Sequence, residues 1–453
     1  MRNLNMSRAF FSDLLSSIVD RGRVLLGRPK GGIASLTREA SLTELCEALL
    51  SKRGEASGTA IAGEILDRYA DLKEDARLAF FETLANEFGP DHRKMEKSIK
   101  AWHDNPANET STDLHFSSEP RRQELFRRLN RTTGGTVALV RMREQLLEQL
   151  PSRPTLGPVN RDLAHLFSSW FNRGFLVLKP IDWTTPVNIL EKIIQYEAVH
   201  AIQNWDDLRN RLKPIDRRCF AYFHPQLIDE PLIFVEVALT RIIPRTISSL
   251  LESNRAPIPA QDATIAVFYS ISNTQKGLAG ISFGNFLIKQ VVSELQQTLP
   301  HLKTYVTLSP IVNFASWLKL ERSKEMSVWL QASDKKVLAY LDQTGWHNDA
   351  LRCKAIKKVL MPIAASYFLK ARASTGGHLD AVARFHLGNG ARLEQLNFLG
   401  DKSPHGLQQS HGLMVNYCYV LEDIEKNHEA FTEGGIVVTS PLVQEQVHAE
   451  LFA

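Results

Sequence analysis

The chain has 453 residues, of which 43% are hydrophobic and 23% charged, and these proportions exclude a disordered or fibrous protein. Its length predicts two domains, or three. Lysine and arginine exceed aspartate and glutamate by only four (54 against 50), too few for a nucleic-acid-binding surface, so we expect no nucleic-acid partner.

The N-terminal segment, residues 2–19, mixes basic and apolar residues in the manner of a transit peptide. Asp13 interrupts it and Asp20 follows it, and its apolar run is too broken for a secretory signal. We interpret it as a first helix. No stretch approaches the ~18 uncharged apolar residues of a membrane span. We therefore expect no membrane partner and a cytoplasmic location.

Two segments of the first 170 residues have a clear helical pattern. Apolar residues recur at helical spacing over 75–88, where Gly89 and Pro90 supply a stop, and over 136–150, which Pro151 ends. These patterns predict packing helices.

A basic cluster lies between them, at Arg121, Arg122, Arg127, Arg128 and Arg131. A solvated helix face or a subunit contact accounts for such a cluster, and we assign it no ligand.

Residues 151–158 are rich in helix breakers and predict a linker. Another helix follows, with Asn160 as its N-cap and Gly174 at its end. Beyond it, short β-branched and aromatic runs alternate with helical patterns, which predicts a domain of mixed α and β structure. We place the domains at 1–174 and 175–453. The predicted strands cover 220–223, 232–239, 265–271, 305–308, 392–398 and 413–420.

Metal-ligand spacing is missing from the sequence. The four cysteines lie far apart and form no CxxC pair, which indicates neither a zinc site nor a disulfide framework. Four histidines gather near the C-terminus without HExxH or paired spacing. We expect no metal. The histidines are His378, His386, His405 and His411.

A glycine-rich turn joins the strand-like run 264–272 to a helical run that ends near residue 299. Gly277, Gly280 and Gly284 let the backbone approach a ligand, and a helix N-terminus favours an anion such as a pyrophosphate. A structural glycine turn explains the pattern equally well. The spacing is similar to the pyrophosphate loop of the GNAT acyltransferases.

Several longer motifs resemble the malonyl-CoA decarboxylase family in order and spacing. The resemblance covers nearly all of the second domain and, more loosely, the helical first domain. It implies an N-terminal all-helical oligomerisation domain, a GNAT-like mixed-sheet catalytic domain and a homo-oligomer, a tetramer as in the family. The motifs are residues 197–200, 204–205, 230–232, 237–240, 268–280, 284–289, 300–302, 308–311, 385–391 and 412–417.

The resemblance also implies the site residues. It assigns catalysis to Ser309 and His386, and it places Ser270 and Tyr419 in the lining of the substrate pocket. Animal members carry glutamate at the position of Ser282. The implied malonyl-CoA loop consists of Ala279, Gly280, Ile281, Ser282, Phe283, Gly284 and Asn285.

The implied reaction converts malonyl-CoA to acetyl-CoA and CO2, and these residue types suit it. Loss of CO2 leaves an enolate that needs hydrogen-bond donors and then a proton. A serine linked to a histidine tuned near neutral pH supplies both, without metal or biotin as a cofactor. Taken alone, Ser309 before a proline is more typical of a turn, and His386 at a strand end of a structural histidine. The alternatives are a CoA-dependent acyltransferase of the same fold and a non-enzymatic CoA-sensing assembly protein.

Overall fold

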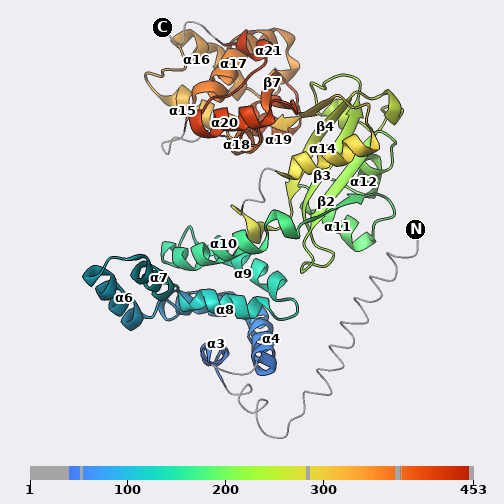
Figure 1. Ribbon diagram of the computed structural model, residues 1–453. Helices are drawn as coiled ribbons and strands as arrows, with labels where there is room; N and C mark the ends of the chain where they lie inside the picture. Colours follow the sequence, from blue (N-terminus) through green and yellow to red (C-terminus); the bar gives the residue numbers. More distant parts are fainter. Residues whose placement is uncertain (1–39, 52–54, 282–285, 373–377, 379, 448–453) are drawn as a thin grey trace. The chain divides into compact units, whose positions relative to one another are not determined.

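The computed structural model describes residues 40–51, 55–281, 286–372, 378 and 380–447 (Figure 1). The chain divides into two compact units. One contains the described residues up to Ser169 together with Gly277–Ile281, and the other contains Trp170–Lys276 and the described residues from 286 onward. The proposed domains 1–174 and 175–453 stay a prediction, and the contact division adds that a short segment from the middle of the chain packs with the helical unit.

The described elements of the first unit are helices, and the apolar stripes of the two predicted helices contribute to its core. Phe81, Leu84, Leu139 and Leu146 are buried, so these helices pack as expected. The predicted N-terminal helix lies outside the described residues. The helices are α3 (Leu42–Leu50), α4 (Glu55–Asp71), α5 (Glu74–Asn86), α6 (His92–Asp104), α7 (Asn108–Ser117), α8 (Arg121–Asn130), α9 (Gly135–Gln149) and α10 (Gly157–Trp170).

The predicted linker and N-cap before α10 are wrong. A short 3-10 turn covers Pro154–Leu156, and α10 begins directly after it at Gly157. Pro158 is tolerated there because the first turn of a helix needs no backbone N–H partner. Asn160 lies inside the helix, and its Oδ1 accepts a hydrogen bond from Arg143 Nε at 2.9 Å.

The arginine cluster of α8 is only partly a solvated face. Arg122 is buried and forms an ion pair with Asp162 at 2.5 Å. Arg128 donates to the carbonyl oxygen of Leu49 at 2.5 Å, near the end of α3, where unpaired helix carbonyls favour a cation. These two arginines therefore hold the helices of their own unit together.

Gly277 marks a close approach between the inserted segment and α9. A Cβ atom at this position would lie 1.9 Å from the carbonyl oxygen of Val140. Arg143, one turn further along α9, donates to the carbonyl oxygens of Gly277 at 2.6 Å and Ala279 at 2.9 Å. The segment is thus fastened to the helical unit by backbone contact at a position that has no room for a side chain.

We predict that Gly277→Ala destabilises the protein by about 1–3 kcal/mol, the usual cost of forcing a methyl group into a packed site. Gly58→Ala is the control, because its Cβ would meet only Leu49 Cδ1 at 3.9 Å. Gly58 lies inside α4, where alanine is favoured over glycine by about 1 kcal/mol. Urea unfolding of both variants measures the difference; equal stabilities would contradict the close approach.

The second unit is built on a mixed sheet of eight described strands, and all predicted strands are confirmed to within a few residues. The main order is β1-β2-β3-β4-β5-β8-β6, with β7 on the other edge of β8. Only β4 and β5 pair in parallel among these strands. The strands are β1 (Val177–Ile181), β2 (Arg217–Phe223), β3 (Pro231–Thr240), β4 (Ile265–Asn273), β5 (Thr304–Thr307), β6 (Ser309–Pro310), β7 (Arg392–Asn397) and β8 (Met414–Tyr419).

Strand β1 was not predicted, because Lys179 and Pro180 interrupt its apolar pattern. Proline cannot donate to a strand ladder and is confined to edges, and β1 is the edge strand beside β2. Its register against β2 is antiparallel, with Pro180 opposite Phe220.

Helices cover the two faces of the sheet. Helices α11 and α12 bury Ile193 and Leu208 against Cys219 and Ala221 of β2. On the opposite face of β2, the hydroxyl of Tyr222 donates to the carbonyl oxygen of Leu287 in α14 at 2.6 Å. Figure 1 shows further helices gathered around β7. The helices are α11 (Val187–Tyr196), α12 (Trp205–Leu212), α13 (Ser248–Leu251), α14 (Phe286–Thr298), α15 (Phe314–Ser323), α16 (Ala332–Leu338), α17 (Ala350–Lys370), α18 (Ala381–Gly388), α19 (Pro404–Ser410), α20 (Ile424–Gly434) and α21 (Pro441–Gln444).

These elements confirm the broad form of the predicted fold class, a helical region followed by a mixed sheet with helices. Among the described residues, no helix has the length and apolar content needed to cross a membrane.

The middle of the sheet opens where β4 and β5 part. Their parallel pairing ends at Phe268 and Thr307. On the other side of β4, Glu236 pairs with Ser270 while Val237 pairs with Phe268, so Tyr269 is the extra residue of a β-bulge. Bulges bend a strand and redirect its side chains, and this one lies beside the opening.

Candidate active site

A cavity of about 130 Å³ lies where β4 and β5 separate. Its wall combines segments that are distant in sequence: the turn after α11, strands β4 and β6, and helices α18 and α19. Mostly apolar side chains surround a few polar groups, as is typical of small-molecule sites. The lining residues are Ala198, Val199, Phe268, Tyr269, Ser270, Ile271, Ser309, Pro310, Val312, Val382, His386, His405 and Gln409.

Ser309 stands at this cavity on the short strand β6 and is only 7% exposed. It is therefore a strand residue rather than the turn residue that its sequence alone suggested. Its hydroxyl donates to Thr307 Oγ1 at 2.9 Å, which in turn accepts from the backbone N–H of Tyr417 at 3.2 Å. Backbone contacts of the sheet thus orient the serine through a threonine.

His386 lies in helix α18, so its predicted place at a strand end is wrong. Helix α18 begins after Asp380, whose side chain accepts from the N–H of Ala383. The buried ring of His386 places Nε2 3.4 Å from Ser309 Oγ and Nδ1 2.8 Å from the hydroxyl of Tyr419. The serine distance is at the long end of the hydrogen-bond range, as is common for catalytic pairs without substrate.

The ring of His386 also stacks on Tyr417, with ring centroids 4.7 Å apart. Contacts at both nitrogens and on one face hold the imidazole in a single orientation. Ser309 and His386 are 77 positions apart, and the fold brings them together with Tyr419.

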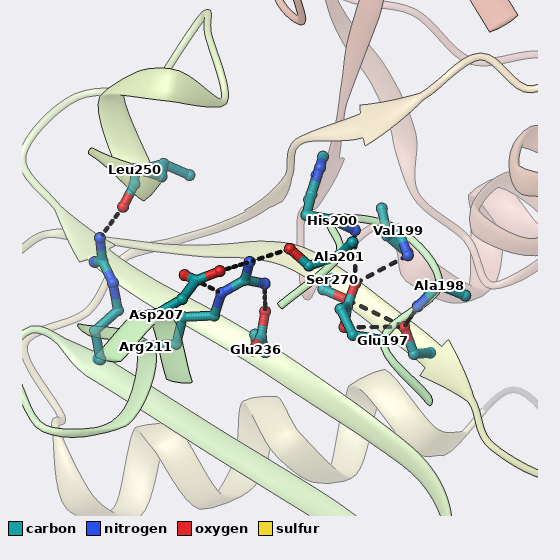
Figure 2. Close-up of polar contacts among 12 residues, drawn as sticks. Glu197, Ala198, Val199, His200, Ala201, Asp207, Arg211, Glu236, Leu250 and Ser270 are labelled. Carbon is teal, nitrogen blue, oxygen red and sulfur yellow. Dashed lines mark hydrogen bonds and ion pairs between the residues drawn. The ribbon is translucent and has the colours of Figure 1, made fainter. Parts of the chain in front are cut away.

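Ser270 lines the same cavity from β4 and contacts a glutamate that the site prediction missed. Figure 2 shows its hydroxyl beside Glu197, and the Oγ lies 2.8 and 2.7 Å from the two carboxylate oxygens. Glu197 was noted only as the first residue of the motif 197–200. An acidic residue directly after an amphipathic segment was the available signal, but spacing could not show that it would be buried or which strand it would reach.

The predicted malonyl-CoA loop is described only in part. Ala279, Gly280 and Ile281 belong to the helical unit, and Gly280 has a φ of +76°, a left-handed conformation that favours glycine. The rest of the predicted loop lies outside the described residues: Ser282, Phe283, Gly284 and Asn285.

The described part of the chain contains no group of three or more histidine, cysteine, aspartate or glutamate side chains placed to hold a metal ion. Of the four C-terminal histidines, His378 uses its ring nitrogens on its surroundings: Nε2 lies 3.0 Å from the carbonyl oxygen of Phe368, and Nδ1 accepts from the N–H of Asp380.

Comparison with known proteins decides the family. Residues 88–171 match the family model of the malonyl-CoA decarboxylase N-terminal domain, and residues 174–452 match that of the C-terminal domain. The chain belongs to the malonyl-CoA decarboxylase family.

Solved structures of family members extend the similarity to the whole fold. A malonyl-CoA decarboxylase from Rhodopseudomonas palustris is 57% identical with a TM-score of 0.87, and the match covers 89% of this chain and 98% of that one. One from Agrobacterium vitis is 54% identical with the same TM-score, covering 90% and 100%. The mitochondrial malonyl-CoA decarboxylase of Anser anser anser is 34% identical, over 82% of this chain and 80% of its own. The cytoplasmic location of this family member stays a prediction.

Burial sets the charge of the histidine in this family member. It lowers the pKa of His386 to about 3, because the charged imidazolium loses its hydration. Burial also raises the pKa of Tyr419 well above its usual value. The expectation of a histidine tuned near neutral pH is therefore wrong for the unliganded protein: both groups are neutral at pH 7.

We predict that His386 does not titrate between pH 5 and pH 8 in the unliganded protein. Nitrogen-15 NMR of the imidazoles, with the signal assigned by its loss in His386→Asn, measures this directly. In the unfolded chain His386 takes up a proton near pH 6.5, whereas in the folded chain it does so only near pH 3. The contribution of neutral His386 to the free energy of unfolding is therefore full above pH 6.5 and is lost as the pH falls from 6.5 toward 3. A midpoint near pH 7 would contradict the neutral assignment.

Proposed function

We propose that this chain converts malonyl-CoA to acetyl-CoA and CO2 and that Ser309 and His386 move the proton. Membership of the malonyl-CoA decarboxylase family supports the reaction. The observation that carries the residue assignment is the contact between Ser309 Oγ and His386 Nε2, 3.4 Å apart at a cavity formed where β4 and β5 separate.

The reaction breaks one C–C bond and forms one C–H bond. The bond between the carboxylate carbon and the α-carbon breaks, CO2 leaves, and the electron pair stays on the α-carbon and the thioester oxygen as an enolate. One proton from solvent is then consumed at the α-carbon. Donors placed where the negative charge develops lower the barrier most in a dry cavity.

Neutral His386 suits this sequence of events. An imidazolium in this buried position is costly without a partner, and the developing enolate is a negative charge that offsets the cost. A proton from solvent can therefore pass through His386 Nε2 to Ser309 Oγ, while the Ser309 hydroxyl turns from Thr307 Oγ1 and gives its own proton to the α-carbon. The ring then returns to its neutral state. Tyr419 supports Nδ1 throughout, with its hydroxyl 2.8 Å away.

The cavity places no lysine or arginine beside Ser309, as far as its lining residues go. A tight cationic clamp would stabilise the carboxylate charge that the reaction must remove. Mostly apolar walls suit a group that leaves as neutral CO2. We propose that the acyl group occupies this cavity and that the loop Ala279–Asn285 receives the CoA pyrophosphate.

We predict that Ser309→Ala and His386→Asn each lower kcat by roughly 10²-fold or more, the scale of general acid–base assistance, with a modest effect on KM. Residues that act in one proton path give non-additive losses, so the double variant should be little worse than the poorer single variant. Release of labelled CO2 from malonyl-CoA by the purified protein is the measurement. Multiplying losses would show that the two residues act independently.

The same assay separates the alternative functions. A CoA-dependent acyltransferase would need an acceptor, and a CoA-sensing assembly protein would bind malonyl-CoA without turnover. Release of CO2 from malonyl-CoA alone excludes both.

We further propose that the reaction needs neither metal nor biotin, since the assigned steps use side chains of this chain. Activity should survive exhaustive chelation and avidin treatment. Complete loss with chelator and recovery with one particular divalent metal would overturn this mechanism. The homotetramer implied by the family resemblance is also a proposal, which sedimentation equilibrium tests.

A further inference from the structure

We propose that Glu197 is a positioning residue that turns the Ser270 hydroxyl into a hydrogen-bond acceptor for the substrate, and that the group it accepts from is an amide N–H of the pantetheine arm. The substrate identity rests on the proposed function; the role of Glu197 rests on the contacts below.

Glu197 is buried directly after α11, with an exposed fraction of 7%, and all its hydrogen-bond contacts are with donors. The backbone N–H groups of Val199 and His200 donate to Oε1 at 2.9 and 2.7 Å. The hydroxyls of Ser270 and Ser272, at alternate positions on one face of β4, donate to the same carboxylate. This is the arrangement that an acceptor-only carboxylate requires.

These contacts decide whether the Ser270 hydroxyl acts as a hydrogen-bond donor or acceptor toward the cavity. Its only proton points at Glu197, from which Oγ is 2.8 and 2.7 Å away, so it has no second proton to offer the cavity. Ser272, 3.2 Å from Ser270, also donates to Glu197 and accepts from the N–H of Ala198 at 3.3 Å. Ser270 therefore presents lone pairs to the cavity that it lines.

The cavity wall beside Ser270, residues 198–201, is held at its C-terminal end as well as by Glu197. Arg211 is buried and donates to the carbonyl oxygen of Ala201 at 3.3 Å (Figure 2). It is fixed by ion pairs with Glu236 at 3.1 Å and Asp207 at 3.2 Å. Glu236 lies directly opposite Ser270 in the sheet register. Residues 198–201 are thus anchored on two adjacent strands, which leaves Ser270 little freedom to turn.

A hydrogen-bond acceptor at Ser270 can bind only a part of the substrate that carries a donor. The ionised malonyl group and its thioester carry acceptor oxygens and no N–H or O–H donor. The amide groups of the pantetheine arm do carry N–H donors, and the amide nearest the sulfur is separated from it by two carbons. Ser270 is therefore matched to the arm and mismatched to the carboxylate, which stays without a donor from this side.

The experiment compares two unreactive acetyl thioesters that differ in one group. S-acetyl N-acetylcysteamine keeps the first amide N–H, and its ester counterpart, made from 2-acetoxyethanethiol, replaces N–H with an oxygen that repels an acceptor. Dissociation constants from NMR titration give an amide-to-ester preference, which we expect to be about tenfold in the wild type, the scale of one hydrogen bond.

Ser270→Ala and Glu197→Gln should each bring this preference close to one, because the glutamine amide can donate to Ser270 and free its proton toward the cavity. The double variant should match Ser270→Ala. Glu321→Gln is the matched control: Glu321 is also buried and accepts from a serine hydroxyl, that of Ser327 at 2.8 Å, but does not line the cavity. It should keep the wild-type preference.

Each result decides the proposal. If Ser270→Ala keeps the wild-type amide-to-ester preference, Ser270 does not accept from the N–H group. If Glu197→Gln still changes this preference in the Ser270→Ala background, Glu197 does not act through Ser270 and its role is structural. Circular dichroism checks folding, and if Glu197→Gln does not fold, the Ser270→Ala preference still decides the N–H contact. Because no turnover is involved, CO2 release by the wild type, measured in parallel, tests the proposed function separately.

Discussion

The parting of β4 from β5 is the constraint on which the site depends. The ladder between these two parallel strands covers only Ile265 to Phe268 of β4, so beyond that point β4 and β5 are no longer paired with each other. The bulge at Tyr269 bends β4 beside the opening, while β5 stays paired with β8 and the chain after it continues this pairing through Ser309. Ser270 and Ser309 therefore line one cavity although they lie on different strands.

Burial then imposes the chemistry of the polar groups around that opening. A buried polar side chain must find a partner, and the partners here are specific: Thr307 for Ser309, Tyr419 for His386, and Glu197 for Ser270. The same burial keeps the imidazole neutral, with its pKa lowered to about 3. A neutral histidine that gains a proton only when negative charge develops nearby is suited to protonating a transient enolate.

The two units are not joined by a single connection in sequence. The segment Gly277–Ile281 follows β4 but packs with the helical unit, where Arg143 holds the carbonyl oxygens of Gly277 and Ala279. This segment forms the first part of the proposed pyrophosphate loop. The helical unit therefore fixes the conformation from which that proposed loop begins.

The sequence by itself determined the helical first part, most strands of the second part and, through its motifs, the family. The roles that those motifs imply for Ser309, His386, Ser270 and Tyr419 stay predictions. The spacing of apolar residues shows which face of a single element is buried. It could therefore predict β4 as a strand and α9 as a helix, but not which elements they pack against. It could not place β1, whose Pro180 hides an edge strand, or the start of α10. Only the tertiary structure decided that His386 lies on a helix, that it is neutral, and that Glu197 reaches Ser270. These properties depend on desolvation and on contacts across many positions of sequence, and both arise only when distant segments pack together.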